Sequence, residues 1–247
     1  MIYDMAIAPF ADYGFMRRAL IACFALALGG GPIGTFLVLR RMSLMGDAMS
    51  HAILPGAAIG FLVAGLSIWS MSAGGLVAGL AVVLLAGLIS RATALREDAS
   101  LAGFYLISLA LGVLIVSAKG SNVDLLHVLF GTILSVTDDA LLLIASIATL
   151  TLVTLAVIYR PLVIECFDPA FLRATTGGGT LWHFVFLVLV VVNLVAGFQA
   201  LGTLMALGLM MLPAAAARFW AGAVWSLAAL STVLAFLSGL VGLLVSY

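Results

Sequence analysis

The sequence predicts an all-α polytopic membrane protein with about eight membrane-spanning helices, a short outer helix and a short cytoplasmic helix. Two observations carry this prediction. First, 65% of the 247 residues are hydrophobic and only 8% are charged, whereas an ordinary soluble domain is about 25% charged. Second, a membrane-spanning helix needs about 20 apolar residues, and stretches of that kind occupy nearly the whole chain. We therefore expect residues 1–247 to form a single transmembrane domain.

The apolar stretches give the expected spans in order. They cover residues 19–39, 46–66, 69–90, 100–118, 138–159, 180–197, 200–217 and 221–246. Between the fourth and fifth spans, residues 122–131 are expected to form a short amphipathic or re-entrant helix, because irregular backbone at membrane depth must pack on protein. Ser135 or Thr137, followed by Asp138 and Asp139, predicts a capped start for the fifth span.

The basic residues indicate which loops face the cytoplasm. Seven of the ten lysine and arginine residues fall in alternate loops, namely Arg40, Arg41, Arg91, Arg96, Arg160, Arg173 and Arg218. Because cytoplasmic loops are enriched in such residues, we place these loops inside and the N-terminus outside. Arg17, Arg18 and Lys119 fall on the outer side, and the two arginines oppose this orientation. The net charge of zero argues against a nucleic-acid partner.

Glycine-rich spacings occur in the first spans. Residues 29–34 match the G-x-G-x-x-G pattern, but a dinucleotide site needs a preceding strand in a soluble βαβ unit. Here the match lies inside an apolar span and contains Pro32, so we reject a nucleotide site and expect a helix kink or close helix packing. Gly56 and Gly60, in small-xxx-small spacing, are expected to pack helices tightly within the chain.

The most informative polar residues are Asp47 and His51 in the second apolar span. Their i, i+4 spacing places both side chains on one helix face, one turn apart. A carboxylate and an imidazole that converge can form half of a divalent-cation site. An ionised Asp at membrane depth costs about 2.5–3.5 kcal/mol, whereas an interhelical polar contact contributes only about 0.6 kcal/mol. We therefore expect the pair to bind a metal ion or a proton rather than to make a structural contact alone.

The remaining polar residues give weaker signals. Ser50 points about 100° around the helix from His51, which argues against a Ser–His–Asp nucleophile. Asp124 and His127, near the outer helix, are candidates for an entry path. His183 is interpreted as a structural residue at a membrane interface. The methionines near Asp47 are interpreted as apolar filler, and the two cysteines lie too far apart in sequence to suggest a disulfide or a metal site.

The loop after the fifth span carries helix-boundary signals. Asp168 suits an N-cap and Pro169 suits the first helical position, and a glycine run at 177–179 would end the helix. The signals predict a helix of about two turns at the membrane surface, although the caps alone are equally compatible with a plain structural loop. Its apolar side would consist of Phe167, Phe171 and Leu172.

Five ordered blocks resemble the zinc/manganese/iron ABC-transporter permease family. They are residues 40–56, which include Gly46-Asp47-Ala48-Met49-Ser50-His51, then Arg96-Glu97-Asp98, residues 124–134, Phe167-Asp168-Pro169 and residues 212–218. The resemblance runs from about residue 15 to the end. It implies a multi-pass permease subunit of a bacterial inner-membrane importer for a divalent transition metal, Zn²⁺, Mn²⁺ or Fe²⁺.

The resemblance also implies partners. A second permease copy, two cytoplasmic ATP-binding subunits and an extracytoplasmic metal-binding protein are expected, in addition to the lipid bilayer. ATP hydrolysis would belong to the partner subunits, and the chain itself has no Walker-type G-x-x-x-x-G-K-[ST] motif. We therefore expect a transport subunit that is not an enzyme and holds no permanent cofactor.

Residue roles follow from the same resemblance. Asp47 and His51 are expected to line the translocation path, where two copies would bring two such pairs together across a two-fold axis. The coupling helix that docks on the ATPase is expected to include Phe167, Asp168, Pro169, Phe171 and Arg173. Members of the family usually continue after the position of Tyr247 into one more apolar helix, so we expect that helix to be missing. The alternative function is a stand-alone secondary metal transporter or channel that needs no ATPase.

Overall fold

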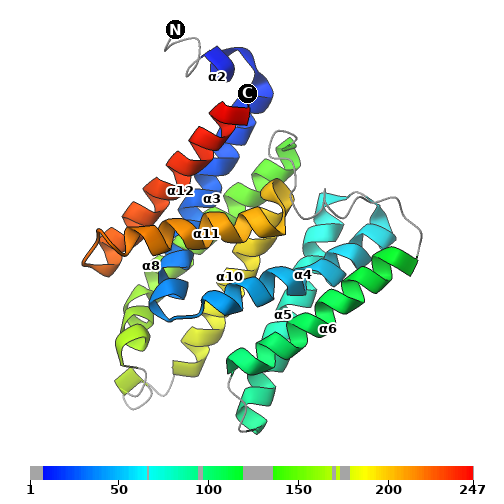
Figure 1. Cartoon of the computed structure of the whole chain (residues 1–247), viewed down its shortest axis with the longest axis vertical. Coiled ribbons are helices and arrows are strands. Elements are labelled where there is room, and N and C mark those ends of the chain that lie inside the picture. The colour runs from blue at the N-terminus through cyan, green and yellow to red at the C-terminus, as the bar shows by residue number, and fades with distance from the viewer. Residues whose placement is uncertain are drawn as a thin grey trace.

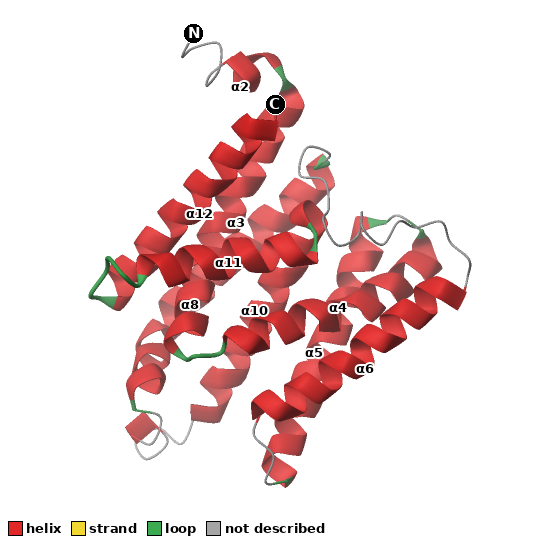
Figure 2. Cartoon of the chain, in the orientation of Figure 1, coloured by secondary structure: helices red, strands yellow, loops and turns green. Residues whose placement is uncertain are grey.

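The computed structural model describes residues 8–65, 67–93, 97–118, 136–168, 171–172 and 179–246. Within these ranges the chain forms helices and no strand (Figure 2). The long helices are α3 (Gly14–Leu39), α4 (Ser43–Ala64), α5 (Ile68–Ala92), α6 (Glu97–Ala118), α8 (Asp138–Phe167), α10 (Gly179–Leu201), α11 (Thr203–Ala217) and α12 (Val224–Ser246). Each expected span is present as a helix, and a short helix α2 (Ala8–Asp12) that the sequence did not suggest precedes them.

Most of these helices are long and apolar enough to cross a membrane. Six of those described meet both criteria, namely α3, α4, α5, α8, α10 and α12. The apolar stretches of α6 and α11 are shorter, at Ala99–Ile115 and Leu204–Ala217. Large apolar side chains such as Val63 and Val157 are exposed on the outer faces, as expected for surfaces that meet lipid rather than water. The prediction of an all-α multi-pass membrane protein is confirmed.

The helices form two groups joined by α10 (Figure 1). In one group α3 packs against α8, α11 and α12, and in the other α4 packs against α5 and α6. α10 contacts members of both groups, and it contributes Phe186 and Leu187 to the main core beside Phe36 of α3 and Met49 of α4. The start of α3 and the end of α12 lie at the same end of the bundle, where Met16 and Leu243 share a core cluster.

α8 is longer than the sequence predicted. The expected end at residue 159 is wrong, because the helix continues through Pro161 to Phe167. A proline inside a helix costs about 3 kcal/mol, but the extension places Leu162 fully inside the main core. Burial of one such side chain contributes about 1.5–3 kcal/mol, so packing can offset most of the local penalty. The predicted cap at the other end is confirmed, since Thr137 Oγ1 accepts a hydrogen bond from the Ala140 N–H at 3.3 Å.

The break between α10 and α11 also lies later than predicted. Gly202, with φ of 79°, separates the two helices, whereas the sequence placed the break between residues 197 and 200. A positive φ is accessible to glycine without steric cost. The side chain of Gln199 donates a 2.8 Å hydrogen bond to Ser72 Oγ on α5, so the last turn of α10 is held in place up to this glycine.

Close packing explains the glycines of the first two spans. A Cβ atom built on Gly34 would lie within 2 Å of the Met210 carbonyl oxygen on α11, and one built on Gly31 would lie 2.8 Å from Thr232 Cα on α12. Both glycines lie in α3, which remains one continuous helix through Pro32. Close packing, rather than a break in the helix, is therefore the role of residues 29–34. Gly56 likewise lies against the Gly74 backbone of α5.

A tight turn connects α3 to α4. The Arg41 N–H donates to the Val38 carbonyl at 3.1 Å and the Met42 N–H donates to the Leu37 carbonyl at 2.9 Å, which is the Schellman pattern of a helix C-terminus. Arg41 occupies the left-handed position of this motif with φ of 59°, where glycine is usual. Three residues thus fix the direction in which α4 leaves α3.

Replacement of Arg41 tests the strain in this turn. A non-glycine residue in the left-handed region costs about 1–2 kcal/mol, so Arg41→Gly is expected to be more stable than Arg41→Ala by about 1 kcal/mol. The alanine variant controls for loss of the charge. Thermal unfolding of both purified variants in the same detergent measures the difference. An alanine variant that melts at or above the glycine variant would contradict the turn geometry.

Replacement of Gly34 tests the packing of α3 on α11. Gly34→Ala forces the two backbones apart, and overpacking of this kind costs about 1–3 kcal/mol or more. Gly103 on α6 has no atom within 4 Å of a Cβ position, so Gly103→Ala is the matched control and should be neutral or stabilising. Fluorescence-detected size-exclusion chromatography after a heating series compares the two. Equal melting temperatures would refute the close contact.

Candidate functional site

α4 presents Asp47 and His51 on one face, as their spacing predicted. His51 Nε2 lies 3.6 Å from Asp47 Oδ1. The exposed fraction is 48% for the Asp47 side chain and 18% for that of His51, so the carboxylate opens to the surface of the single chain while the imidazole lies deeper. The two polar atoms therefore converge at a point that the described residues leave open.

Contacts from α6 hold the imidazole of His51. Its ring centroid lies 5.8 Å from that of Tyr105 at an interplanar angle of 30°. The other ring nitrogen, Nδ1, is buried and has no hydrogen-bond partner among the described residues. Nearby, Ser108 Oγ donates to the Ala52 carbonyl at 3.2 Å, which ties α6 to the same turn of α4. Tyr105 is a part of the site that the sequence analysis did not identify.

The pair can supply two ligands to a metal ion. An ion bonded at about 2.1 Å to two atoms 3.6 Å apart would subtend an angle of about 120° between them, which is close to the angles of tetrahedral and trigonal sites. Among the described residues no group of three or more His, Cys, Asp or Glu side chains could hold a metal. Among these residues the pair therefore offers two ligands and no more.

The neighbouring polar and sulfur-containing residues do not add ligands. Ser50 Oγ donates a 2.8 Å hydrogen bond to the Asp47 carbonyl oxygen, so its hydroxyl serves the backbone and is not arranged as a nucleophile for His51. Met45 and Met49 are buried in the main core, in agreement with their interpretation as apolar filler.

The chain after α8 begins with the cap that the sequence predicted. Asp168 Oδ1 accepts a 2.9 Å hydrogen bond from the Phe171 N–H, which is the contact an N-cap makes with the third helical residue. Phe167 and Phe171 are exposed, whereas Leu172 is buried. The segment from Phe167 to Leu172 thus presents two aromatic rings outward. The predicted roles of Pro169, Arg173, Asp124 and His127 concern residues outside the described ranges.

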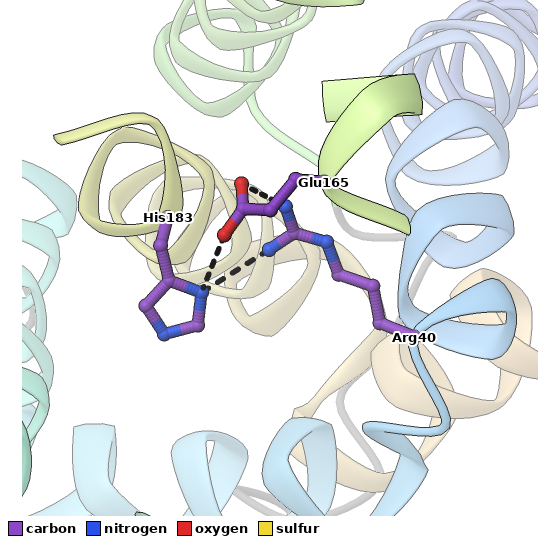
Figure 3. A network of polar contacts seen from close by, with 3 residues as sticks. All are labelled: Arg40, Glu165 and His183. Atoms are coloured by element: carbon purple, nitrogen blue, oxygen red, sulfur yellow. Dashed lines mark hydrogen bonds and ion pairs between the residues drawn. The ribbon is translucent and has the colours of Figure 1, made fainter. Parts of the chain in front are cut away.

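A largely buried ionic cluster lies at the end of the bundle where α8 ends (Figure 3). It consists of Arg40 after α3, Glu165 in the last turn of α8 and His183 in α10. Sequence patterns place Arg40 in a cytoplasmic loop and His183 at a membrane interface, and they assign no role to Glu165. The signal available was the carboxylate itself, because Glu165 lies inside a helix whose other acidic residues are confined to its first turn.

The chain was compared with known proteins. The sequence model described as "ABC 3 transport family" matches residues 12–247. Manganese import system permease protein ScaB of Streptococcus parasanguinis is 33% identical over 236 residues, which cover 96% of this chain and 83% of that protein. Manganese transport system membrane protein MntC of Listeria innocua is 30% identical over 236 residues, with coverages of 96% and 83%. Chelated iron transport system membrane protein YfeD of Yersinia pestis is 27% identical over 247 residues, with coverages of 100% and 82%.

A solved structure has the same fold. It is described as PsaBC from Streptococcus pneumoniae in complex with Fab, and it superposes with a TM-score of 0.84 at 28% sequence identity. The match covers 100% of this chain and 93% of the other. The arrangement of α3 to α12 is therefore shared over the full length of the chain.

Proposed function

Because this chain belongs to the ABC 3 transport family, we propose that it is the membrane-spanning permease subunit of an ATP-binding-cassette importer for manganese in a bacterial inner membrane. The observation that carries this proposal is the Asp47–His51 pair, a two-ligand site in a helix apolar enough to span a membrane. ScaB is a manganese import permease and MntC a manganese transport membrane protein, which supports Mn²⁺ as the transported ion over Zn²⁺ or Fe²⁺.

The chemistry of the pair suits this cargo. A carboxylate oxygen and an imidazole nitrogen accept Mn²⁺, whereas thiolate ligands would favour Zn²⁺ or Cu⁺, and neither cysteine of the chain belongs to α4. His51 must be neutral to bind a metal. Two permease copies related by a two-fold axis would bring two carboxylates and two imidazoles together. Such a site must hold the ion weakly enough to release it.

The energy for transport would come from partner subunits. Two cytoplasmic ATP-binding subunits would engage the segment that starts at Asp168, with Phe167 and Phe171 as apolar contacts. Closure of these subunits on ATP would displace the segment and switch access to the metal site from the outside to the inside. An extracytoplasmic binding protein would deliver the ion to the outer face.

Substitutions in the pair test its role in transport. Asp47→Ala and His51→Ala each remove one of two ligands, so uptake of radioactive Mn²⁺ into cells that express the complete transporter should fall at least about tenfold, since one lost ligand contact of about 1.4 kcal/mol is a tenfold effect. Ser50→Ala is the control, because its hydroxyl bonds the backbone. Wild-type uptake by both ligand variants, at equal membrane levels, would sink the site assignment.

The cap at Asp168 provides a second test. Asp168→Ala removes the acceptor for the Phe171 N–H, which costs about 1 kcal/mol of local helix stability, whereas Asp168→Asn retains an acceptor oxygen. We expect the alanine variant to hydrolyse ATP with less Mn²⁺ uptake per ATP and the asparagine variant to be close to wild type. Fully coupled uptake by the alanine variant would remove the docking role from this segment.

The dependence on ATP separates this function from a stand-alone secondary transporter. Purification from membranes should yield an ATP-binding subunit with the permease. Proteoliposomes that contain both subunits should take up Mn²⁺ only when ATP is present. This uptake should persist after the proton gradient has been collapsed. Uptake by the permease alone, driven by a proton gradient, would favour the secondary transporter instead.

A further inference from the structure

Three helices are joined by the partly buried side chains of Arg40, Glu165 and His183 (Figure 3). One Nη atom of Arg40 donates to Glu165 Oε2 at 2.5 Å, and the other lies 3.2 Å from His183 Nδ1. The Glu165 Oε1 atom lies 3.7 Å from the same Nδ1. The exposed fractions are 6% for Arg40, 13% for Glu165 and 20% for His183. The planar guanidinium therefore bridges α8 and α10 at once, which a lysine ammonium could not do with the same geometry.

Stability alone does not explain this cluster. Replacing a buried ion pair with apolar side chains is often neutral or stabilising, so such a pair is better understood through the relative position that it fixes. A metal site is also a poor explanation, because the positive guanidinium lies within hydrogen-bond distance of both the carboxylate and the imidazole. The Arg40 guanidinium is further fixed over the Phe186 ring, with Cζ at 4.7 Å from the ring centroid.

The cluster connects directly to the segment that begins at Asp168. Glu165 precedes Asp168 by three residues, and the Asp168 N–H still donates to the Ile164 carbonyl at 2.7 Å. The Asp168 carboxylate then caps the following turn at Phe171. Because these bonds are continuous, a displacement of the segment moves the Glu165 carboxylate with it.

The cluster connects equally directly to α4. Arg40 is the first residue of the Schellman turn, and hydrogen bonds from the N–H groups of Arg40, Arg41 and Met42 back to α3 hold this turn rigid. The Met42 carbonyl accepts from the Met45 and Gly46 N–H groups, which places Asp47 in the first turns of the same rigid unit. A force on the Arg40 guanidinium is thus delivered to the helix that carries Asp47 and His51.

We propose that Arg40, Glu165 and His183 form a positioning joint that transmits movement of the Asp168 segment to α4 and thereby to the metal-binding pair. This inference rests on the proposed function, since it assigns the route by which ATP-driven movement reaches the site. The residues of the joint touch neither the metal nor ATP, so their effect appears in the coupling between hydrolysis and transport.

The chain offers a matched control for this joint. The same two helices, α3 and α8, are also linked at their other ends by Arg18 and Asp138, whose Nη1 and Oδ1 atoms lie 3.4 Å apart. That pair is exposed, at 43% and 80%, and exposed pairs contribute little. The effect of losing the Arg40–Glu165 pair on coupling can therefore be compared with the effect of losing the Arg18–Asp138 pair at the other end of the same two helices.

The test measures Mn²⁺ ions transported per ATP hydrolysed. Wild-type permease, Glu165→Gln and Asp138→Asn are each reconstituted in proteoliposomes with the ATP-binding subunits that co-purify with the permease. Glu165→Gln keeps the shape of the side chain and removes its charge, and we expect the ratio to fall about tenfold, within the range of residues that couple distant sites. Asp138→Asn should change the ratio less than about twofold.

Companion variants separate a joint from an ordinary structural contact. Arg40→Ala and Glu165→Ala each remove one partner of the same pair. The double variant should therefore have a transport-to-hydrolysis ratio no lower than that of the more impaired single variant. Arg40→Lys should assemble into the complex but show a lower ratio of Mn²⁺ transported to ATP hydrolysed. If the alanine variants fail to assemble, this variant tests the joint in their place. A wild-type ratio in Glu165→Gln or Arg40→Lys, even with a lower melting temperature, overturns the joint.

The outcome for the joint is distinguishable from that for the proposed function. Absence of ATP-dependent Mn²⁺ uptake in the wild-type complex would refute the importer. Coupled uptake in the wild type together with an unchanged ratio in Glu165→Gln would leave the importer intact and remove only the joint.

Discussion

A polar side chain inside an apolar bundle is costly unless it meets another polar group, and this constraint organises the chain. Asn193 in α10 shows the ordinary solution, since its amide donates to Thr151 Oγ1 at 2.7 Å and to the Leu189 carbonyl at 2.8 Å. Arg40, Glu165 and His183 likewise meet one another through polar atoms, although Arg40 Nε has no hydrogen-bond partner among the described residues. The Asp47–His51 pair differs in that its carboxylate is half-exposed and open to a further partner, and the buried His51 Nδ1 atom has no hydrogen-bond partner within the part of the chain that the structure describes. In a membrane helix such a departure points to a ligand.

Packing explains how such polar sites are held in fixed positions. Glycines let α3 meet α11 and α12, and let α4 meet α5, at backbone contact. The Schellman turn then fixes α4 relative to α3 with only three intervening residues. In a helix bundle with such close contacts, strain is transmitted through the packed helices, so whole helices move rather than single side chains. We therefore expect the proposed transport cycle to move α4, with the site proposed on it, as one unit with the turn that follows α3.

The sequence predicted the helices, their order and the shared face of Asp47 and His51 because these depend on local hydrophobicity and helix periodicity. It also predicted the Thr137 and Asp168 caps, which depend on side-chain bonds within three residues. It did not predict that α8 passes through Pro161, because burial of Leu162 against distant helices decides that boundary. The ionic cluster escaped prediction for the same reason, since Arg40 and Glu165 are 125 residues apart. The contact of Tyr105 with His51 likewise required the packing of α6 on α4.

In the proposed transporter, Asp47 and His51 form half of a Mn²⁺ site that two copies of the chain complete. Binding stoichiometry tests it most directly. Purified permease in lipid nanodiscs is titrated with Mn²⁺, and bound ion is followed by the loss of the free Mn²⁺ signal in electron paramagnetic resonance. We predict one Mn²⁺ for every two chains in the wild type and loss of that site in Asp47→Asn. One ion per chain, or binding that survives Asp47→Asn, would contradict the account.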